Sequence, residues 1–238
     1  MLVNRKGIIC RAIKYGESSL ILDIFSADTG MKSYICSGVR KKRSSKSAIL
    51  QVMNFVDFIC YVKSEEKASL LRIKEIKYHK IYKNIPFDIV RGTLGMFLLE
   101  VTRKAIHQTD DSTPIYAFIE SKFSSLDDSD TVLSDFHIVY MIQLAQLLGF
   151  EMQNNFDDKH PYFSLKDGMF IPNPANHRFV LDQDLSELLF TYLKSIRPVT
   201  TKRDRIRLLE SLVSYYAYHI DSFGSIKSLE VLQSLYDT

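Results

Sequence analysis

The hydrophobic and polar positions of the first 83 residues alternate as they do in β-strands. In the clearest stretch, Leu71, Ile73, Ile76 and Tyr78 are separated by charged side chains, with one break at Glu75. Such alternation, together with an enrichment in Ile, Val, Phe and Tyr, indicates half-buried strands. The pattern predicts five strands, over residues 7–15, 19–26, 32–37, 55–62 and 70–78.

Turn residues separate these runs. Gly16 lies between the first two strands, and Asp28-Thr29-Gly30 between the next two is a hairpin signal. Five short strands in about 75 residues are typical of a small closed barrel of the OB or SH3-like kind. We favour the OB type because a longer connection, residues 38–53, separates the third and fourth strands. Within it, residues 47–52 are expected to form one or two helical turns.

From Pro86 onward the apolar spacing changes to three and four residues, which predicts helices. Pro86 is expected in the first turn of the first helix, and Gly149 is expected to end the third. The helices are expected over residues 86–107, 113–126, 131–148, 185–196, 202–222 and 225–236. The sequence therefore predicts an α+β protein. A five-stranded OB-fold barrel in residues 1–83 is followed by an all-helical domain in residues 84–238, with an irregular stretch at 150–182.

Composition excludes several protein classes. The 238 residues are 46% apolar and 25% charged, which is enough for a core and does not suit a disordered chain. The longest stretch without a charged residue, 136–150, is shorter than the roughly 20 residues of a membrane-spanning helix. The first 14 residues carry four cations and do not resemble a secretory signal. Cys10, Cys36 and Cys60 stand singly, so a cytoplasmic protein with reduced thiols is expected.

Charge is divided unequally along the chain. Residues 1–83 contain 17 Lys/Arg and 7 Asp/Glu, whereas residues 84–238 contain 14 and 21. The first part therefore carries +10 and the second −7, although the net charge is only +3. This asymmetry favours a polyanion as the partner of the barrel. Lysines that only keep a small domain soluble are the alternative explanation.

The strongest local signal is the segment 40–46, in which five of seven residues are cations. Such closely spaced charges repel one another unless an anion neutralises them. A phosphate backbone would do so, and the string alone would equally suit a nuclear-localisation signal or a solvated loop. This segment is expected on an OB barrel that carries further cations, which favours nucleic acid as its binding partner. The candidate binding residues are Arg5, Lys6, Arg11, Lys14, Lys32, Arg40, Lys41, Lys42, Arg43 and Lys46.

Aromatic side chains in the barrel offer stacking surfaces. OB barrels hold single strands in cationic grooves in which bases stack on aromatic rings. Some of the rings must instead fill the barrel core, and the sequence leaves both roles open. The candidates are Tyr15, Tyr34, Phe55, Phe58 and Tyr61.

An acidic cluster is a candidate for catalysis. Asp127, Asp128 and Asp130 lie among serines between two helices, a composition typical of a solvated turn and helix cap. A carboxylate metal site is the alternative.

A second polar group is a candidate for metal binding. Asp157, Asp158, His160 and His177 lie in a proline-containing loop, without the spacing of a metal motif. No Walker A, G-x-G-x-x-G or G-x-S-x-G sequence occurs in the chain. The residues therefore favour a binding protein over an enzyme.

Two sets of residues, one near each end of the chain, form recognisable signatures. The first set is Tyr15-Gly16-Glu17-Ser18-Ser19, Phe25, Gly30 and Gly38-Val39-Arg40. The second set is Leu208-Leu209, Tyr215-Tyr216, His219, Phe223-Gly224 and residues 227–232. In order and separation, both sets resemble the signatures of the RecO family of bacterial recombination mediators, and the first half is similar to Bacteroidetes-type members.

The resemblance implies a DNA repair protein that is not an enzyme and uses no cofactor. RecO-like proteins bind single- and double-stranded DNA through an OB domain and anneal complementary strands, including strands coated with single-strand binding protein (SSB). With RecR they help RecA to load in RecF-pathway repair, at the cytoplasmic nucleoid and without a membrane. Many members hold zinc with four cysteines, but residues 150–182 contain none. We therefore expect no zinc, and an irregular loop or short hairpin in its place.

The same resemblance implies that the helical domain captures the acidic C-terminal tail of SSB. Cations beside a hydrophobic pocket suit such a peptide. One candidate cluster lies at the start of a helix, where cations oppose the helix dipole and a ligand, either DNA or the tail, would explain them. This cluster is Lys202, Arg203, Arg205 and Arg207, and the alternative set is Arg91, Arg103 and Lys104.

Two other classes of function stay open. An RNA-binding OB protein would share the basic barrel but would prefer RNA through contacts with its 2′-hydroxyl groups. A metal-dependent nuclease using Asp127, Asp128 or Asp157 would degrade DNA when magnesium or manganese is supplied.

Overall fold

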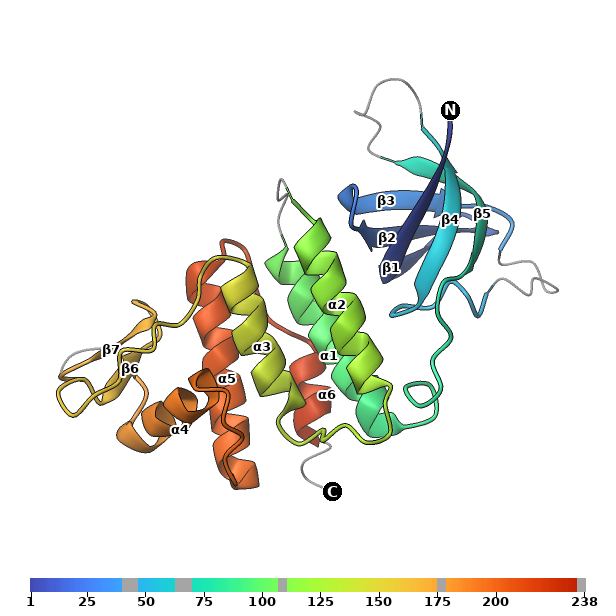
Figure 1. Cartoon of the computed structure of the whole chain (residues 1–238). Helices are drawn as coiled ribbons and strands as arrows, with labels where there is room; N and C mark the ends of the chain where they lie inside the picture. Colours follow the sequence, from blue (N-terminus) through green and yellow to red (C-terminus); the bar gives the residue numbers. More distant parts are fainter. Residues whose placement is uncertain (40–46, 63–69, 107–110, 175–178, 235–238) are drawn as a thin grey trace. The chain divides into compact units, whose positions relative to one another are not determined.

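The chain forms two compact units, each assembled from separate stretches of sequence. The computed structural model describes residues 1–39, 47–62, 70–106, 111–174 and 179–234 (Figure 1). The first unit comprises Met1–Leu99 and Ile106–Ser129, and the second comprises Glu100–Ala105 and Asp130–Thr238.

The five predicted strands are present and close into a barrel (Figure 1). The strands are β1 (Leu2–Tyr15), β2 (Ser19–Ser26), β3 (Gly30–Cys36), β4 (Phe55–Tyr61) and β5 (Leu71–Tyr78). They follow one another around the barrel in the order β1-β2-β3-β5-β4, and only the β3–β5 pair is parallel. β1 is five residues longer than expected, because its first half pairs with β4 and its second half with β2. The predicted OB-fold barrel followed by helices is confirmed.

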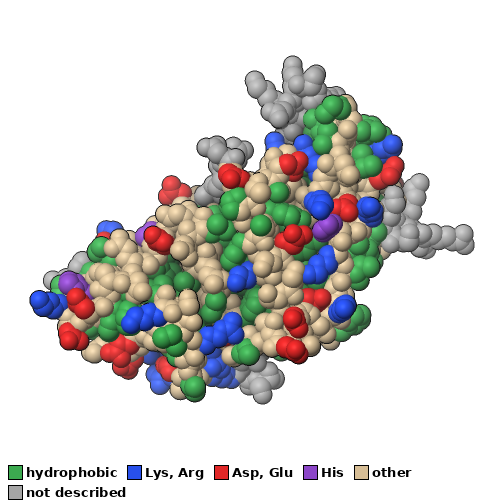
Figure 2. Space-filling model, viewed as in Figure 1, with side chains coloured by type: hydrophobic (Ala, Val, Ile, Leu, Met, Phe, Trp, Pro, Cys, Tyr) green, Lys and Arg blue, Asp and Glu red, His purple; other side chains and the backbone are tan. Residues whose placement is uncertain are grey.

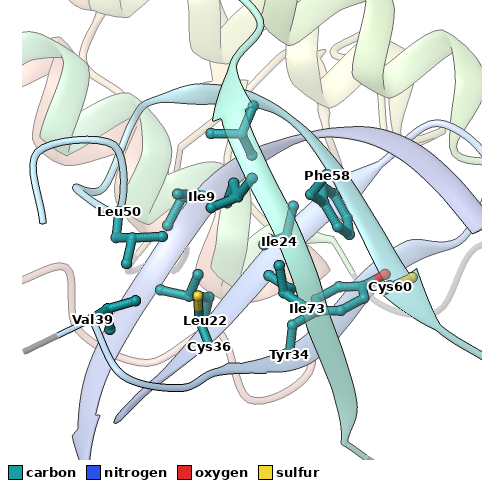
Figure 3. Close-up of a cluster of buried hydrophobic side chains, with 12 residues drawn as sticks. Ile9, Leu22, Ile24, Tyr34, Cys36, Val39, Leu50, Phe58, Cys60 and Ile73 are labelled. Carbon is teal, nitrogen blue, oxygen red and sulfur yellow. The ribbon is translucent and has the colours of Figure 1, made fainter. Parts of the chain in front are cut away.

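The barrel interior is filled by the apolar positions of the alternating pattern. In β4, the inward side chains Val56, Phe58 and Cys60 are at most 1% exposed. Figure 3 shows the core side chains of several strands pointing toward one another. Val39 and Leu50, from the connection between β3 and β4, join the same cluster.

The connection between β3 and β4 departs from expectation within its described part. Ser47–Leu50 form turns rather than the predicted helical turns. The side-chain amide of Asn54 donates to the carbonyls of Ala48 and Ile49, at 2.9 and 3.0 Å. These two carbonyls are therefore not available for the backbone hydrogen bonds of a helix. Buried Leu50 packs into the barrel core and fixes the segment there.

Part of the barrel's outer surface is covered by a helix of the same unit. Phe25 and Phe55 are both fully buried, although they alternate with core residues and so point outward. The ring of Phe55 lies 6.0 and 6.1 Å from the rings of Tyr116 and Phe123, which belong to α2 (Thr113–Leu126). The first unit therefore contains more of the chain than the barrel, and the predicted boundary after residue 83 stays a prediction.

A buried carboxylate joins the end of α2 to the segment that leaves the barrel. Asp127 is 8% exposed and accepts hydrogen bonds from the backbone N–H groups of Lys83, Asn84 and Ile85 at 2.9 to 3.1 Å. Burial would raise the pKa of Asp127, but these N–H donors outweigh it and hold that pKa below its usual value. The interpretation of Asp127 as part of a solvated turn is wrong, because its oxygens are engaged by distant backbone.

A buried arginine also contacts the residues at the end of α2. Arg91, in α1 (Ile89–Ala105), donates to the carbonyls of Leu126, Asp128 and Ser129 at 2.6 to 3.0 Å. The Asp88 carboxylate accepts from the backbone of Val90 and Arg91, so the helix begins after Asp88. Pro86 therefore lies before the helix rather than in its first turn.

In the residues that the structure describes, the second unit contains four further helices and a short hairpin. They are α3 (Phe136–Leu147), β6 (Tyr162–Ser164), β7 (Met169–Ile171), α4 (Gln183–Leu193), α5 (Lys202–His219) and α6 (Ser228–Ser234). α3 begins five residues later than expected, because residues 131–135 take a non-helical path. The β6–β7 hairpin lies within residues 150–182, where an irregular loop or a short hairpin was expected. No helix in the described part of the chain is long and apolar enough to cross a membrane.

The last residues of α1, Glu100–Ala105, belong to the second unit and make a capping contact within it. The Glu100 carboxylate accepts from the backbone N–H groups of Lys227 and Ser228, at 3.1 and 2.8 Å, ahead of α6. Burial would raise the pKa of Glu100, but the Ser228 and Lys227 donors lower it on balance.

His137 makes the stability of the second unit sensitive to acid. It is fully buried in α3, and this burial, with a smaller effect from Arg205, lowers its pKa to about 3. The folded pKa of His137 lies below the unfolded value of 6.5, so the unfolded state binds a proton more readily than the folded state. The stability of the second unit is therefore full above pH 6.5 and decreases as the pH falls below that value. We expect a loss of about 2 kcal/mol by pH 5.

Urea unfolding of His137→Gln at pH 7.5 and pH 5 measures this dependence. The variant is expected to be less stable at pH 7.5 and to lose less than the parent on acidification. His160→Gln, at a more exposed histidine of the same unit, is the control and should lose more stability than His137→Gln on acidification. An equal loss on acidification in parent and His137→Gln would contradict the prediction.

Candidate nucleic-acid interface

The barrel sorts the five candidate aromatic residues into two sets. Tyr34 and Phe58 fill the core, with ring centroids 4.9 Å apart, and Phe55 is buried against α2. Tyr15 and Tyr61 are 53% and 47% exposed. Only these two of the five have a ring face available to a base.

A row of cross-strand neighbours runs around the outside of the barrel through Tyr61. Ile13 pairs with Ile21, Ile21 with Ile35, Ile35 with Arg72, and Arg72 with Tyr61. Directly opposed residues on one face of a sheet lie within side-chain contact. The exposed cation of Arg72 therefore sits between an exposed tyrosine and a partly buried apolar strip.

Further residues extend this row at the end of the barrel where β1 turns into β2. The Arg72 guanidinium donates to the hydroxyl of Ser37 at 3.2 Å, and the N–H of Val39 donates to the Ser18 carbonyl at 2.9 Å. Lys14 and Tyr15 are exposed at the end of β1. We call Lys14, Tyr15, Tyr61 and Arg72 the turn-end surface.

The five most closely spaced cations follow this surface in sequence. The chain passes from Val39 directly into Arg40, Lys41, Lys42, Arg43 and Lys46. All five lie outside the described residues, so their role in nucleic-acid binding stays a prediction.

Arg5 and Lys32 lie at inward-facing positions of the barrel. Arg5 donates to the Tyr34 hydroxyl at 2.9 Å and lies 3.4 Å from the Asp28 carboxylate. Burial would lower the pKa of Arg5, but the hydrogen bond to Tyr34 and the Asp28 charge raise it on balance. Its side chain is only 10% exposed, and Lys32 pairs with the core residue Ile24. The structure therefore separates both cations from the turn-end surface.

Arg11 and Lys6 lie on the outer surface beside acidic residues. The Arg11 guanidinium is 2.6 Å from the Asp23 carboxylate, which also accepts from Ser33. Lys6 is exposed and pairs with Asp57 across the sheet. Figure 2 shows the same mixing over the face that it displays, where lysines and arginines are interspersed with acidic side chains.

The basic cluster at the start of α5 is partly engaged within the unit. Arg205 donates to Thr200 at 2.8 Å, and Arg207 pairs with the Asp182 carboxylate. Lys202 and Arg203 are exposed. These two are the most exposed members of the cluster.

The alternative set on α1 is less accessible. Arg91 is 6% exposed and its guanidinium is used on three carbonyls. Lys104 donates to the Ser225 carbonyl, and Arg103 is half-buried. Arg91 is therefore part of the protein interior and we leave it out of the proposal below.

The second polar group forms a local turn in its described part. Asp157 accepts from the backbone of Lys159 and His160, at 2.9 and 2.8 Å, and from the His160 ring at 2.7 Å. His177 lies outside the described residues. In the residues that the structure describes, no group of three or more His, Cys, Asp and Glu side chains could hold a metal ion.

Arg72 is a site residue that the sequence reasoning did not single out. The signal was present in the alternation of β5, where Arg72 stands between Leu71 and Ile73. A charge at that position marks the outward face. What the sequence did not contain was the pairing of Arg72 with Tyr61, which depends on the order of strands in the barrel.

The turn-end surface predicts a defined loss of single-strand binding. Tyr61→Ala should weaken affinity for single-stranded DNA by about 1–3 kcal/mol through lost base stacking. Arg72→Ala should reduce the slope of log affinity against log salt by about 0.7. Fluorescence anisotropy over a salt series measures both effects. Tyr218→Ala and Lys166→Ala, at exposed positions of the second unit, are the matched controls, and equal effects in controls and test variants would contradict the assignment.

The fold and this surface define a class, an OB-fold barrel protein extended by a helical region. Comparison with known families identifies which one. The model "Recombination protein O N terminal" matches residues 1–82, and "Recombination protein O C terminal" matches residues 86–230. The chain belongs to the recombination protein O (RecO) family.

Individual relatives agree over the full length. The chain is 31% identical over 245 residues to the DNA repair protein RecO of Flavobacterium psychrophilum, covering 99% of this chain and 100% of the relative. It is 29% identical over 244 residues to that of Christiangramia forsetii, with 99% and 100% covered. It is 28% identical over 246 residues to that of Bacteroides fragilis, with 100% of both chains covered.

Proposed function

We propose that this protein is a recombination mediator of RecF-pathway DNA repair, which binds single- and double-stranded DNA and anneals complementary strands. With RecR it helps RecA to load on SSB-coated DNA, makes and breaks no covalent bond, and works on the chromosome in the cytoplasm. Membership of the RecO family supports the repair role. The observation that carries the DNA contact is the turn-end surface, where two exposed tyrosines accompany cations on an OB barrel.

The physical mechanism is the neutralisation of phosphate charge. Two strands approach one another against backbone repulsion, and closely spaced cations lower that repulsion by displacing condensed counterions from both. Tyr15 and Tyr61 would hold one strand by stacking, which needs no particular sequence. The cations of residues 40–46 would contact the second strand. This division of work supports annealing without base-specific contacts.

The cationic segment provides the direct test of this mechanism. Replacing Arg40, Lys41, Lys42 and Arg43 by alanine should weaken binding and reduce the salt slope by up to about 0.7 for each single-strand phosphate contact that is lost. Unchanged affinity and salt dependence would show that this segment does not contact DNA.

An annealing assay separates the proposal from the two alternative functions. Complementary oligonucleotides coated with SSB from the same organism should anneal faster in the presence of the protein. An RNA-binding protein would instead prefer RNA to single-stranded DNA, and a nuclease would shorten DNA when magnesium or manganese is added. A failure to accelerate annealing would contradict the proposed mediator function.

The SSB tail is proposed to bind the second unit near Lys202 and Arg203. Both side chains are exposed at the start of α5, where they can meet an acidic peptide. Calorimetric titration of a tail peptide into Lys202→Glu and Arg203→Glu tests the assignment, with Arg103→Glu as the rival on α1. Loss of binding only in Arg103→Glu would move the contact to α1.

A further inference from the structure

The guanidinium of Arg72 is oriented by a hydroxyl group rather than by a carboxylate. It donates to the Ser37 hydroxyl at 3.2 Å. Arg5, Arg11 and Lys77 of the same barrel instead lie 3.4, 2.6 and 3.9 Å from an aspartate carboxylate. In the part of the chain that the structure describes, Arg72 is in no such ion pair. Its charge is therefore oriented by a neutral partner and stays available to an anion.

Ser37 can orient Arg72 because the backbone on both sides of this serine is fixed. Cys36, the last residue of β3, is 5% exposed and Val39 is 2% exposed, and both side chains belong to the barrel core. The N–H of Val39 also donates to the carbonyl of Ser18, in the turn between β1 and β2, at 2.9 Å. The buried neighbours therefore hold the Ser37 hydroxyl at one place beside β5.

This contact lowers the cost of binding an anion through Arg72. A long arginine side chain loses rotamer freedom when it binds a ligand, and this loss opposes binding. The Ser37 hydroxyl restricts the side chain before a ligand arrives, so part of the loss has already occurred in the free protein. The hydroxyl uses one of the N–H donors of the guanidinium, and the others remain for the oxygens of a phosphate.

Tyr61 adds a surface for a base next to the oriented charge. It is directly opposed to Arg72 across β4 and β5, and its side chain is 47% exposed. Directly opposed residues have Cβ atoms about 4.5–5.5 Å apart. A base that stacks on the Tyr61 ring therefore brings its own backbone phosphate close to Arg72. Stacking on a ring in this way requires a base whose face is free, as in a single strand.

We propose that Ser37 is a positioning residue for the turn-end surface. Its hydroxyl orients the Arg72 guanidinium toward the phosphate of a nucleotide whose base stacks on Tyr61. This inference rests on the proposed function, because it concerns the same contact with single-stranded DNA. Ser37 acts through Arg72, so its contribution to the affinity for a single strand depends on the presence of that side chain.

A double-mutant cycle on the full-length chain tests this dependence. The probe is a fluorescently labelled single strand of thymidine nucleotides, and anisotropy measures its affinity. Ser37→Ala should weaken binding about two- to tenfold, the range expected when one hydrogen bond is lost. The same substitution in the Arg72→Ala background should cause no further loss. Ser37→Thr keeps the hydroxyl and should keep the parent's affinity, whereas a role of Ser37 in packing alone would not be restored by threonine.

Ser124→Ala is the matched control, because the Ser124 hydroxyl accepts from Lys80 at 2.5 Å elsewhere in the same unit. This variant should bind the strand as the parent does. Unchanged affinity in Ser37→Ala would overturn the inference, and so would an equal loss in the Arg72→Ala background or in Ser37→Thr. An equal loss in the control would do the same. A parent protein that does not bind the strand would instead count against the proposed function.

Discussion

Asp127→Ala is expected to destabilise the first unit by about 3–5 kcal/mol. The substitution removes the acceptor of the buried N–H group of Ile85 and of the partly buried N–H groups of Lys83 and Asn84. A buried donor without a partner costs about 1–3 kcal/mol, and each lost hydrogen bond to a charged group about 1.5–3 kcal/mol. A loss of this size is a large part of the stability of an ordinary domain. Urea unfolding followed by circular dichroism measures it.

Two companion variants make the measurement specific. Asp128→Ala removes the neighbouring exposed carboxylate and should change stability by no more than about 0.5 kcal/mol. The stability of Asp127→Asn should lie between that of the parent and that of the alanine variant. The amide oxygen of asparagine can still accept a hydrogen bond, but its NH2 group would face a backbone N–H donor. Equal stability of Asp127→Ala and Asp128→Ala would show that the contacts of Asp127 contribute nothing.

The same carboxylate gives the parent an acid-sensitive component of stability. Its folded pKa lies below the unfolded value of 3.8, so its contribution is complete above that value and declines as the pH falls through the folded pKa. Asp127→Ala should therefore lose less stability than the parent in the most acidic range.

A second large effect is expected from shortening the chain. A fragment of residues 1–83 should fail to fold stably, whereas a fragment of residues 1–129 should give a cooperative unfolding transition. The shorter fragment exposes Phe25 and Phe55, both fully buried in the intact protein, and lacks Asp127. Exposing each phenylalanine costs about 1.5–3 kcal/mol, which a barrel of this size does not readily tolerate.

Amide exchange and thermal unfolding of the two fragments provide the test. Native-like protection of β1 and β4 is expected only in the longer fragment. A third fragment, residues 1–106, retains the whole of α1 but lacks α2, and so isolates the contribution of that helix. A stable, cooperatively unfolding 1–83 fragment would contradict the role assigned to α2.

The strands were predictable because their signal is local. In β4, Asp57 stands at alternate positions with Phe55 and Tyr61, and a charge on that face marks it as outward. The exposure of Tyr61 follows from this pattern. The burial of Phe55 on the same face does not, because it depends on α2, which is about sixty residues further along the chain.

The least predictable features are those in which polar groups bond across long separations. Asp127 and Arg91 have the composition of a surface turn and a helix surface, yet both are buried and meet backbone groups 35 to 44 residues away. Residue type and spacing do not encode such partners. The helical turns expected at residues 47–52 are absent for a related reason, because the Asn54 side chain binds the carbonyls of Ala48 and Ile49.

The candidate site was predictable in kind but only partly in detail. The charge asymmetry and the barrel pattern pointed to a polyanion partner, and Lys14 and Tyr15 lie in the turn-end surface as exposed residues. Arg5 and Lys32 share the same composition but occupy inward-facing positions. The distinction arises from the position along the strand: Lys14 pairs with the core-packed Leu20 but lies at the exposed end of β1, whereas Arg5 and Lys32 lie within their strands.

The division of the chain between its two units limits how the protein can be taken apart. The backbone passes from one unit to the other three times, after Leu99, after Ala105 and after Ser129. No single cut by a protease, and no single break between two genes, would release both units with all their parts. Exchange of one unit between relatives would likewise have to carry several segments together, so we expect the two halves of this family to have been inherited as one piece.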